Sequence, residues 1–175
     1  SAAVEASFLS ASLSDDCPDS RSGAAEDSAA PADAGAGAAR GPGLTGCGSF
    51  CRQTGMQLRF VAEAGGAAHT VEVVEVRLLD GRTDARLDTL TARAPSAWDE
   101  AGGGGYVAWD RQLAPGQTVR ASWKLSAPRW SALGIPSYFG SGAARPLRLE
   151  VVLRIDGATR VVRSGELTRE PEVVT

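Results

Sequence analysis

The residues best suited to chemistry in this chain are its three cysteines, Cys17, Cys47 and Cys51. They flank the stretch 18–46, which is mostly Ala, Gly, Pro and Ser. A bond from Cys17 to either Cys47 or Cys51 would close a loop of about 30 residues and contribute about 3 to 4 kcal/mol by restricting the unfolded chain. The spacing therefore predicts a structural disulfide and location in an oxidising compartment: a periplasm, a cell surface or the medium.

A second interpretation makes the same region a soft-metal site. Cys47 and Cys51, with Met56 and His69, supply the thiolate, thioether and imidazole groups that suit Cu(I) or Zn. Against this, Met56 alternates with polar neighbours and is expected in the core, and His69 lies near Gly65 and is expected to be exposed. Without this site the chain is expected to carry no cofactor.

Aromatic residues gather in the second half of the chain. Trp123 alternates with charged neighbours and is expected in the core, whereas most of the others lie in segments rich in Gly, Pro and Ser. Such rings either plug the open end of the fold, which we favour, or form a recognition surface. The candidates for a partner surface are Trp98, Trp109, Trp130, Tyr138 and Phe139.

Signatures of an enzyme are missing from the sequence. There is no Gly-x-Ser-x-Gly elbow, no phosphate loop and, with one His, no paired-His metal site. Asp80, Asp84 and Asp88 recur every four residues and are expected to form a solvated face. The net charge of −3 argues against nucleic-acid binding, and no apolar run is long enough to span a bilayer.

The pattern of apolar residues predicts strands almost everywhere outside 18–46, which is expected to be a flexible loop. Strict alternation is clearest at Val119–Leu125 and at Leu147–Ile155, and Asp156-Gly157 predicts a hairpin turn. One short helical turn is expected at Pro128–Leu133. Strands are expected at 3–14, 56–63, 74–78, 85–93, 119–125, 147–155 and 159–168.

Seven or eight antiparallel strands with no covering helix predict an all-β, two-sheet sandwich, built as a single domain over 1–175. The run Leu113-Ala114-Pro115-Gly116-Gln117-Thr118, placed before a strand, resembles a turn of bacterial immunoglobulin-like domains. The resemblance covers 56–169. It implies an immunoglobulin-like sandwich that serves as a scaffold or recognition module without catalytic residues, with proteinase-inhibitor-like modules among its relatives.

Together these features predict an exported, non-catalytic binding or structural module whose partner is a protein or a surface glycan. The soft-metal protein and the proteinase inhibitor are the alternatives. The use of Arg over Lys, with much Ala and Gly, indicates a GC-rich bacterial genome. Ser1-Ala2-Ala3 is compatible with a start after a signal peptide, or with a lipid anchor on a cysteine upstream of Ser1.

Overall fold

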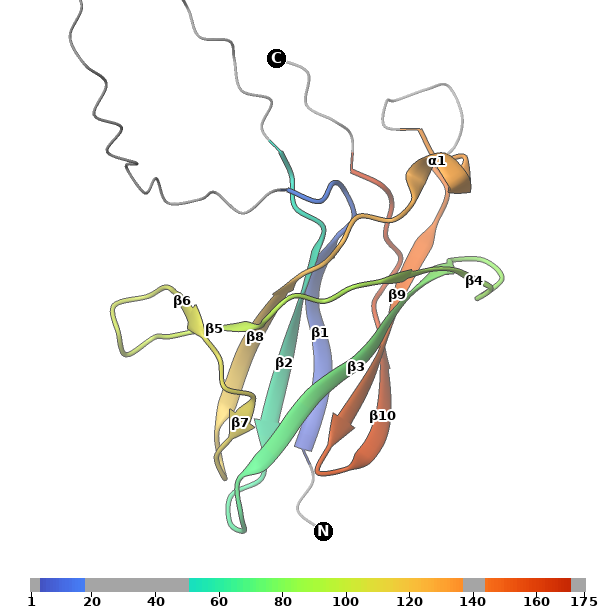
Figure 1. Ribbon diagram of the computed structural model, residues 1–175. Helices are drawn as coiled ribbons and strands as arrows, with labels where there is room; N and C mark the ends of the chain where they lie inside the picture. Colours follow the sequence, from blue (N-terminus) through green and yellow to red (C-terminus); the bar gives the residue numbers. More distant parts are fainter. Residues whose placement is uncertain (1–3, 18–50, 137–143, 171–175) are drawn as a thin grey trace, which may run out of the picture.

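The computed structural model describes residues 4–17, 51–136 and 144–170. Its strands form two antiparallel sheets that pack face to face (Figure 1), which confirms the predicted all-β sandwich. The first sheet has the order β1 (Val4–Ser12), β2 (Gly55–Ala62), β8 (Thr118–Lys124), β5 (Ser96–Trp98) and β6 (Tyr106–Ala108). The second has the order β10 (Ala158–Arg163), β9 (Leu147–Ile155), β3 (His69–Asp80) and β4 (Arg86–Leu90), with β7 (Gln112–Leu113) paired to β3.

Alternation along each strand sends one set of side chains between the sheets. In β2, Leu58 and Phe60 are fully buried while Arg59 between them is exposed. The same alternation in β8 buries Val119 and Ala121 and leaves Arg120 in water. The predicted alternation is therefore confirmed in β2 and β8, whose other residues point to the outer face of the first sheet. In β3 it is interrupted, because the register shifts between Val73 and Glu75 and leaves Val74 45% exposed.

The N-terminal strand lies at the edge of the first sheet. β1 pairs antiparallel with β2, from Val4 opposite Ala62 to Ser12 opposite Gly55. Its Val4 carbonyl accepts a hydrogen bond of 2.6 Å from Arg160 of β10, which joins the two sheets at this side. The predicted order, with 18–46 between the first two strands, is confirmed, although that segment lies outside the described residues.

The described residues contain ten strands, so the expected number of seven or eight was too low. The additional strands β5, β6 and β7 are only two or three residues long, too short to give a periodic signal. β5 pairs with β8 and β7 pairs with β3, whereas β6 pairs with β5 alone. The short helix α1 (Trp130–Leu133) confirms the predicted helical turn.

The outer face of the second sheet carries a ladder of ion pairs. Glu150 is flanked by Arg77 at 2.9 Å and Arg163 at 2.7 Å, and Glu75 pairs with both Arg77 and Arg86. The two arginines lower the pKa of Glu150 despite the opposing effect of burial. Every acidic group of the ladder thus has a basic neighbour, and this face has its charges internally matched.

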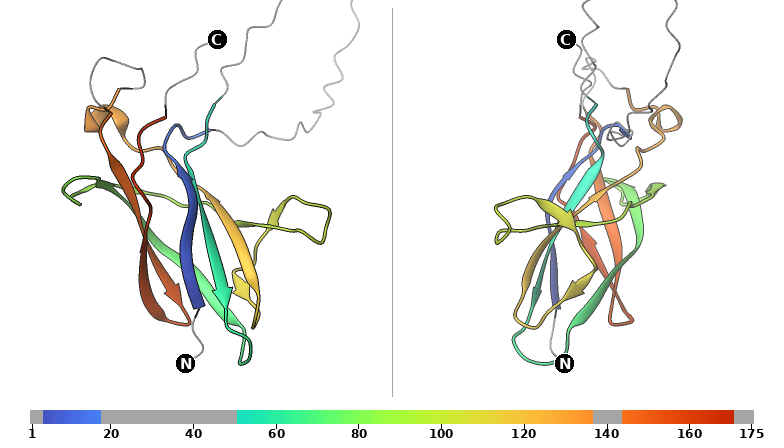
Figure 2. Two further views of the ribbon diagram at one scale, coloured as in Figure 1. Left: turned by 180° about the vertical axis from the view of Figure 1, so that it is seen from behind. Right: turned by 60° about the vertical axis from the view of Figure 1, so that its left-hand side comes forward.

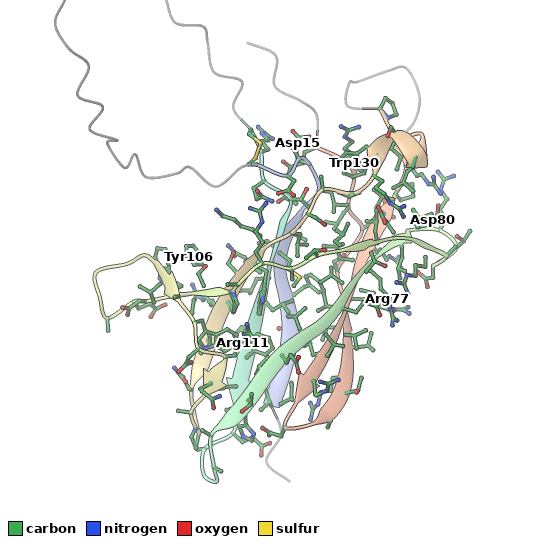
Figure 3. The ribbon with its side chains drawn as sticks, viewed as in Figure 1. Asp15, Arg77, Asp80, Tyr106, Arg111 and Trp130 are labelled. Atoms are coloured by element: carbon green, nitrogen blue, oxygen red, sulfur yellow. A yellow bond between two sulfur atoms is a disulfide. The ribbon has the colours of Figure 1, made fainter. Side chains whose placement is uncertain are left out.

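The expectation of a solvated face at Asp80, Asp84 and Asp88 was wrong for two of the three. Asp80 and Asp88 are buried, with 9% and 6% of their surface exposed. Asp88 forms an ion pair with Arg129 at 2.8 Å, and Asp80 forms one with Arg145 at 2.8 Å. Asp80 is labelled in Figure 3. Their partners are distant in sequence, so spacing alone could not reveal the pairing.

Asp80 makes the stability of the fold sensitive to acid. The guanidinium of Arg145 and the backbone N–H groups of Arg82 and Thr83 lower its pKa from 3.8 to about 2. The unfolded state therefore binds more protons, and this stabilisation is complete above the unfolded value and is lost as the pH falls from about 4 to about 2. We expect Asp80→Asn to be less stable at pH 7 and to lose less stability over that acid range.

Urea unfolding of the wild type and of Asp80→Asn at several pH values checks this expectation. Asp84→Asn is the matched control, because the Asp84 side chain is 45% exposed and its two ion pairs are long, at 3.4 and 3.5 Å. Parallel pH curves for the wild type and Asp80→Asn would contradict the assignment.

A candidate binding face on the first sheet

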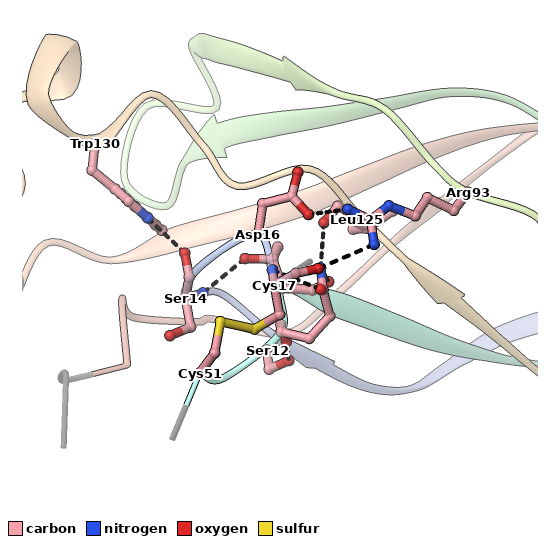
Figure 4. Close-up of a disulfide and its surroundings, with 10 residues drawn as sticks. Ser12, Ser14, Asp16, Cys17, Cys51, Arg93, Leu125 and Trp130 are labelled. Atoms are coloured by element: carbon pink, nitrogen blue, oxygen red, sulfur yellow. Dashed lines mark hydrogen bonds and ion pairs between the residues drawn. A yellow bond between two sulfur atoms is a disulfide. The ribbon is translucent and has the colours of Figure 1, made fainter. Parts of the chain in front are cut away.

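Cys17 and Cys51 are found where the end of β1 meets the entry to β2. Cys17 and Cys51 form a disulfide with their Cα atoms 5.8 Å apart (Figure 4), so the predicted staple is confirmed and its partners are identified. The backbone N–H of Cys17 also donates to the side chain of Gln53 at 2.9 Å. Cys47 lies outside the described residues.

The proposed metal ligands are not brought together in the described part of the chain. Cys51 is oxidised in the disulfide, and Met56 is 2% exposed in the core. His69 was expected to be exposed but is 8% exposed, because the turn after β9 brings Asp156 to 2.6 Å from its Nδ1. Over residues 4–17, 51–136 and 144–170, no three His, Cys, Asp or Glu side chains could share a metal ion.

The predicted aromatic set divides into buried and exposed members. Trp130 is 8% exposed, and its Nε1–H donates to the Ser14 carbonyl at 2.7 Å (Figure 4). Trp109 packs on the core, with its ring centroid 5.7 Å from Phe60. Trp130 is thus buried and Trp109 is partly buried against the core. Tyr138 and Phe139 lie outside the described residues, which leaves Trp98 as the exposed member of the set.

Trp98 stands at the end of β5 with 40% of its surface exposed, and it does not stand alone. Its partner across the β5–β6 pair is Tyr106, which is 49% exposed. The ring centroids are 5.2 Å apart and the planes meet at 72°, an edge-to-face arrangement. Figure 2 shows this hairpin extending beyond β8, so two large rings are presented side by side to solvent.

Next to the aromatic pair, the outer face of the first sheet is polar. The row Ser10–Gln57–Ser122–Ser96 crosses β1, β2, β8 and β5 in register. Gln57 donates from Nε2 to the hydroxyl of Tyr106 at 2.7 Å, which leaves the phenol hydrogen and the Gln57 carbonyl oxygen available to a ligand. The aromatic pair and the polar row are therefore one continuous surface.

An open hollow of about 350 Å³ lies over the adjoining part of β1, β2 and β8. Its lining combines the polar residues Ser10, Gln57 and Ser122 with Ala11, Met56 and Trp123, and most of the exposed lining is apolar. A Cβ at Gly55 would lie 3.2 Å from the Trp123 carbonyl oxygen, so a larger residue there would crowd the backbone of β8.

On the other side of the polar row, two positive charges face each other. Arg59 of β2 lies directly opposite Arg120 of β8, and both are exposed. Neither has an ion-pair or hydrogen-bond partner within the described ranges. Like charges at directly opposed positions are destabilising, so this pair lowers stability with no compensating ion pair among the residues that the structure describes.

Sequence reasoning missed Tyr106, Gln57 and the two arginines as site residues. Alternation did place Arg59 and Arg120 on solvent-facing positions, but the sequence does not give the register that sets one opposite the other. Tyr106 could have been found only from its pairing with Trp98 across the hairpin.

The described residues contain no helix long and apolar enough to cross a membrane. In comparisons with known proteins, no protein-family model matches this chain and no curated protein matches it significantly. The candidate face is thus defined by its own geometry: two exposed rings, a polar row, an open hollow and an uncompensated pair of arginines.

Proposed function

We propose that this chain is an exported, non-catalytic binding module of the immunoglobulin-like type, which holds a surface glycan on the outer face of its first sheet. The observation that carries the proposal is the exposed Trp98–Tyr106 pair beside a row of polar side chains and an open hollow. Rigid aromatic rings contribute large contact area at low cost in conformational entropy. Small hydroxyl and amide groups next to them provide the hydrogen bonds that orient a ligand.

A glycan fits this combination better than a protein surface does. Sugar rings have apolar faces that stack on aromatic side chains and rims of hydroxyl groups that need donors and acceptors. Ser10, Gln57 and Ser122 provide such groups without large apolar side chains between them. A protein partner of ordinary size would require a broad apolar centre, whereas the row across β1, β2 and β8 is polar, with Leu9 of β1 exposed beside it.

Export is supported by the Cys17–Cys51 disulfide, since such bonds form and persist in oxidising compartments. The alternative, a periplasmic carrier of copper or zinc, requires the thiolate of Cys51, which this bond removes. The proteinase-inhibitor alternative is supported by the family resemblance alone. We therefore favour the binding module.

An array of immobilised bacterial envelope polysaccharides, both neutral and acidic, tests this function. We expect the wild type to bind a subset of them and Trp98→Ala/Tyr106→Ala to weaken that binding about tenfold or more, because stacked aromatic anchors are typical hot spots. The matched control is Val74→Ala/Val161→Ala, which removes two exposed apolar side chains (45% and 52%) from the second sheet. If the aromatic variant and the valine variant bound equally well, and both kept the wild-type unfolding midpoint, the proposal would be contradicted.

A further inference from the structure

Resting on the proposed function, we infer that the glycan is acidic and that Arg59 and Arg120 bind its carboxylate or sulfate groups. The two guanidinium groups project from opposed positions of β2 and β8. Proteins tolerate locally unfavourable arrangements mainly at functional sites, where a ligand compensates them. An anion between these side chains would convert their repulsion into two charge-assisted contacts.

The nearest neighbours of Arg59 and Arg120 on this face are uncharged, so the positive charge of the two arginines is available to an anion. Ser7 lies opposite Arg59 on the β1 side, and Gln57 and Ser122 are the next outward residues along β2 and β8. The acidic residue on this part of the face is Glu5, which pairs in register with Val61 and forms no ion pair within the described ranges. The second sheet differs, because there each arginine of the ladder already has a carboxylate.

The layout also indicates an extended ligand. From the arginine row, the outward positions of β2 continue through Gln57 to Gly55 and the hollow, a span of about 14 Å at the usual rise per residue. Trp98 would be the next residue in register opposite Arg120, since Ser96 and Ala97 pair with Ser122 and Ala121. A polymer lying across these positions would meet the arginines with Trp98 beside them, then the hydroxyl and amide groups of the polar row, and then the hollow.

The test measures binding to polygalacturonate, dextran sulfate and hyaluronan, with neutral dextran and polyglutamate as comparison polymers. We expect the wild type to bind at least one acidic polysaccharide and not dextran. Binding should fall steeply between about 0.01 and about 1 M salt, where the Debye length shrinks from about 30 to about 3 Å. Arg59→Gln/Arg120→Gln should weaken it about tenfold or more at low salt, with no loss in unfolding midpoint.

The matched control is Arg82→Gln/Arg154→Gln. It removes the same charge from exposed positions away from the first sheet, where Arg154 pairs with Glu72 at 2.9 Å. Equal weakening by both double variants would show a general charge effect and overturn the inference, as would a lack of binding to all three acidic polysaccharides. Polyglutamate bound as tightly through Arg59 and Arg120 would overturn the assignment to a sugar.

The outcomes separate this inference from the proposed function. If dextran binds as well as the acidic polymers and the arginine variant is unaffected, while Trp98→Ala/Tyr106→Ala binds nothing, the aromatic face is a glycan site and the acidic ligand is refuted. If the aromatic variant binds the envelope array like the wild type, the proposed function itself fails.

Discussion

Replacing Cys17 and Cys51 by Ser is expected to lower the free energy of unfolding by about 3 to 4 kcal/mol. The bond joins residues that are 34 positions apart, so it restricts the unfolded chain. Single domains have about 5 to 15 kcal/mol in total, so this is a large fraction. The bond also anchors β1, whose strand partner β2 begins only at Gly55. We therefore expect the double variant to exchange its backbone hydrogens faster than the wild type in β1, with a smaller change in β9.

Urea unfolding of the wild type and of Cys17→Ser/Cys51→Ser measures the difference, and hydrogen exchange locates it. Cys47→Ser is the control and should unfold like the wild type. Alkylation of the unreduced, denatured protein should label Cys47 and leave Cys17 and Cys51 unmodified until a reductant is added. A loss below about 1 kcal/mol in the double variant, or labelling of Cys51 before reduction, would refute the staple.

Trp130→Ala is expected to destabilise the fold by about 3 to 5 kcal/mol, the usual cost of truncating a large buried aromatic side chain. The indole is 8% exposed and belongs to the core. Its loss leaves the Ser14 carbonyl without its 2.7 Å donor and Arg169 without the ring that it covers at 4.7 Å. At this chain length the unfolding midpoint should fall by about 6 to 20 °C.

Two further variants show where this effect comes from. Trp130→Phe keeps most of the ring but removes the N–H, so it should cost about 1 to 3 kcal/mol for the unsatisfied carbonyl. Trp98→Ala, at a residue that is 40% exposed, should change stability by less than about 1 kcal/mol. If Trp130→Ala weakened glycan binding while stability was unchanged, the assignment of Trp130 to the core would be wrong.

The contrast between Trp98 and Trp130 shows why the sequence settled some predicted roles and not others. Trp98 and Trp130 both lie in short irregular segments, and the local pattern favoured one fate for both. Trp130 is buried because α1 brings it against Ser14, more than a hundred residues earlier. Trp98 stays exposed because the β5–β6 hairpin extends beyond the sandwich (Figure 1).

The sequence by itself determined the all-β class, the long alternating strands and the core positions of strands such as β2 and β8. Period-two burial is a local property, and a local pattern is enough to specify it. The sequence also predicted a disulfide from Cys17, but the choice of Cys51 as its partner came from the tertiary structure. Only the tertiary structure decided which strands are neighbours and in what register. That register places Arg59 opposite Arg120 and Trp98 beside Tyr106, because a cross-strand pair depends on backbone hydrogen bonds between segments that no spacing rule connects.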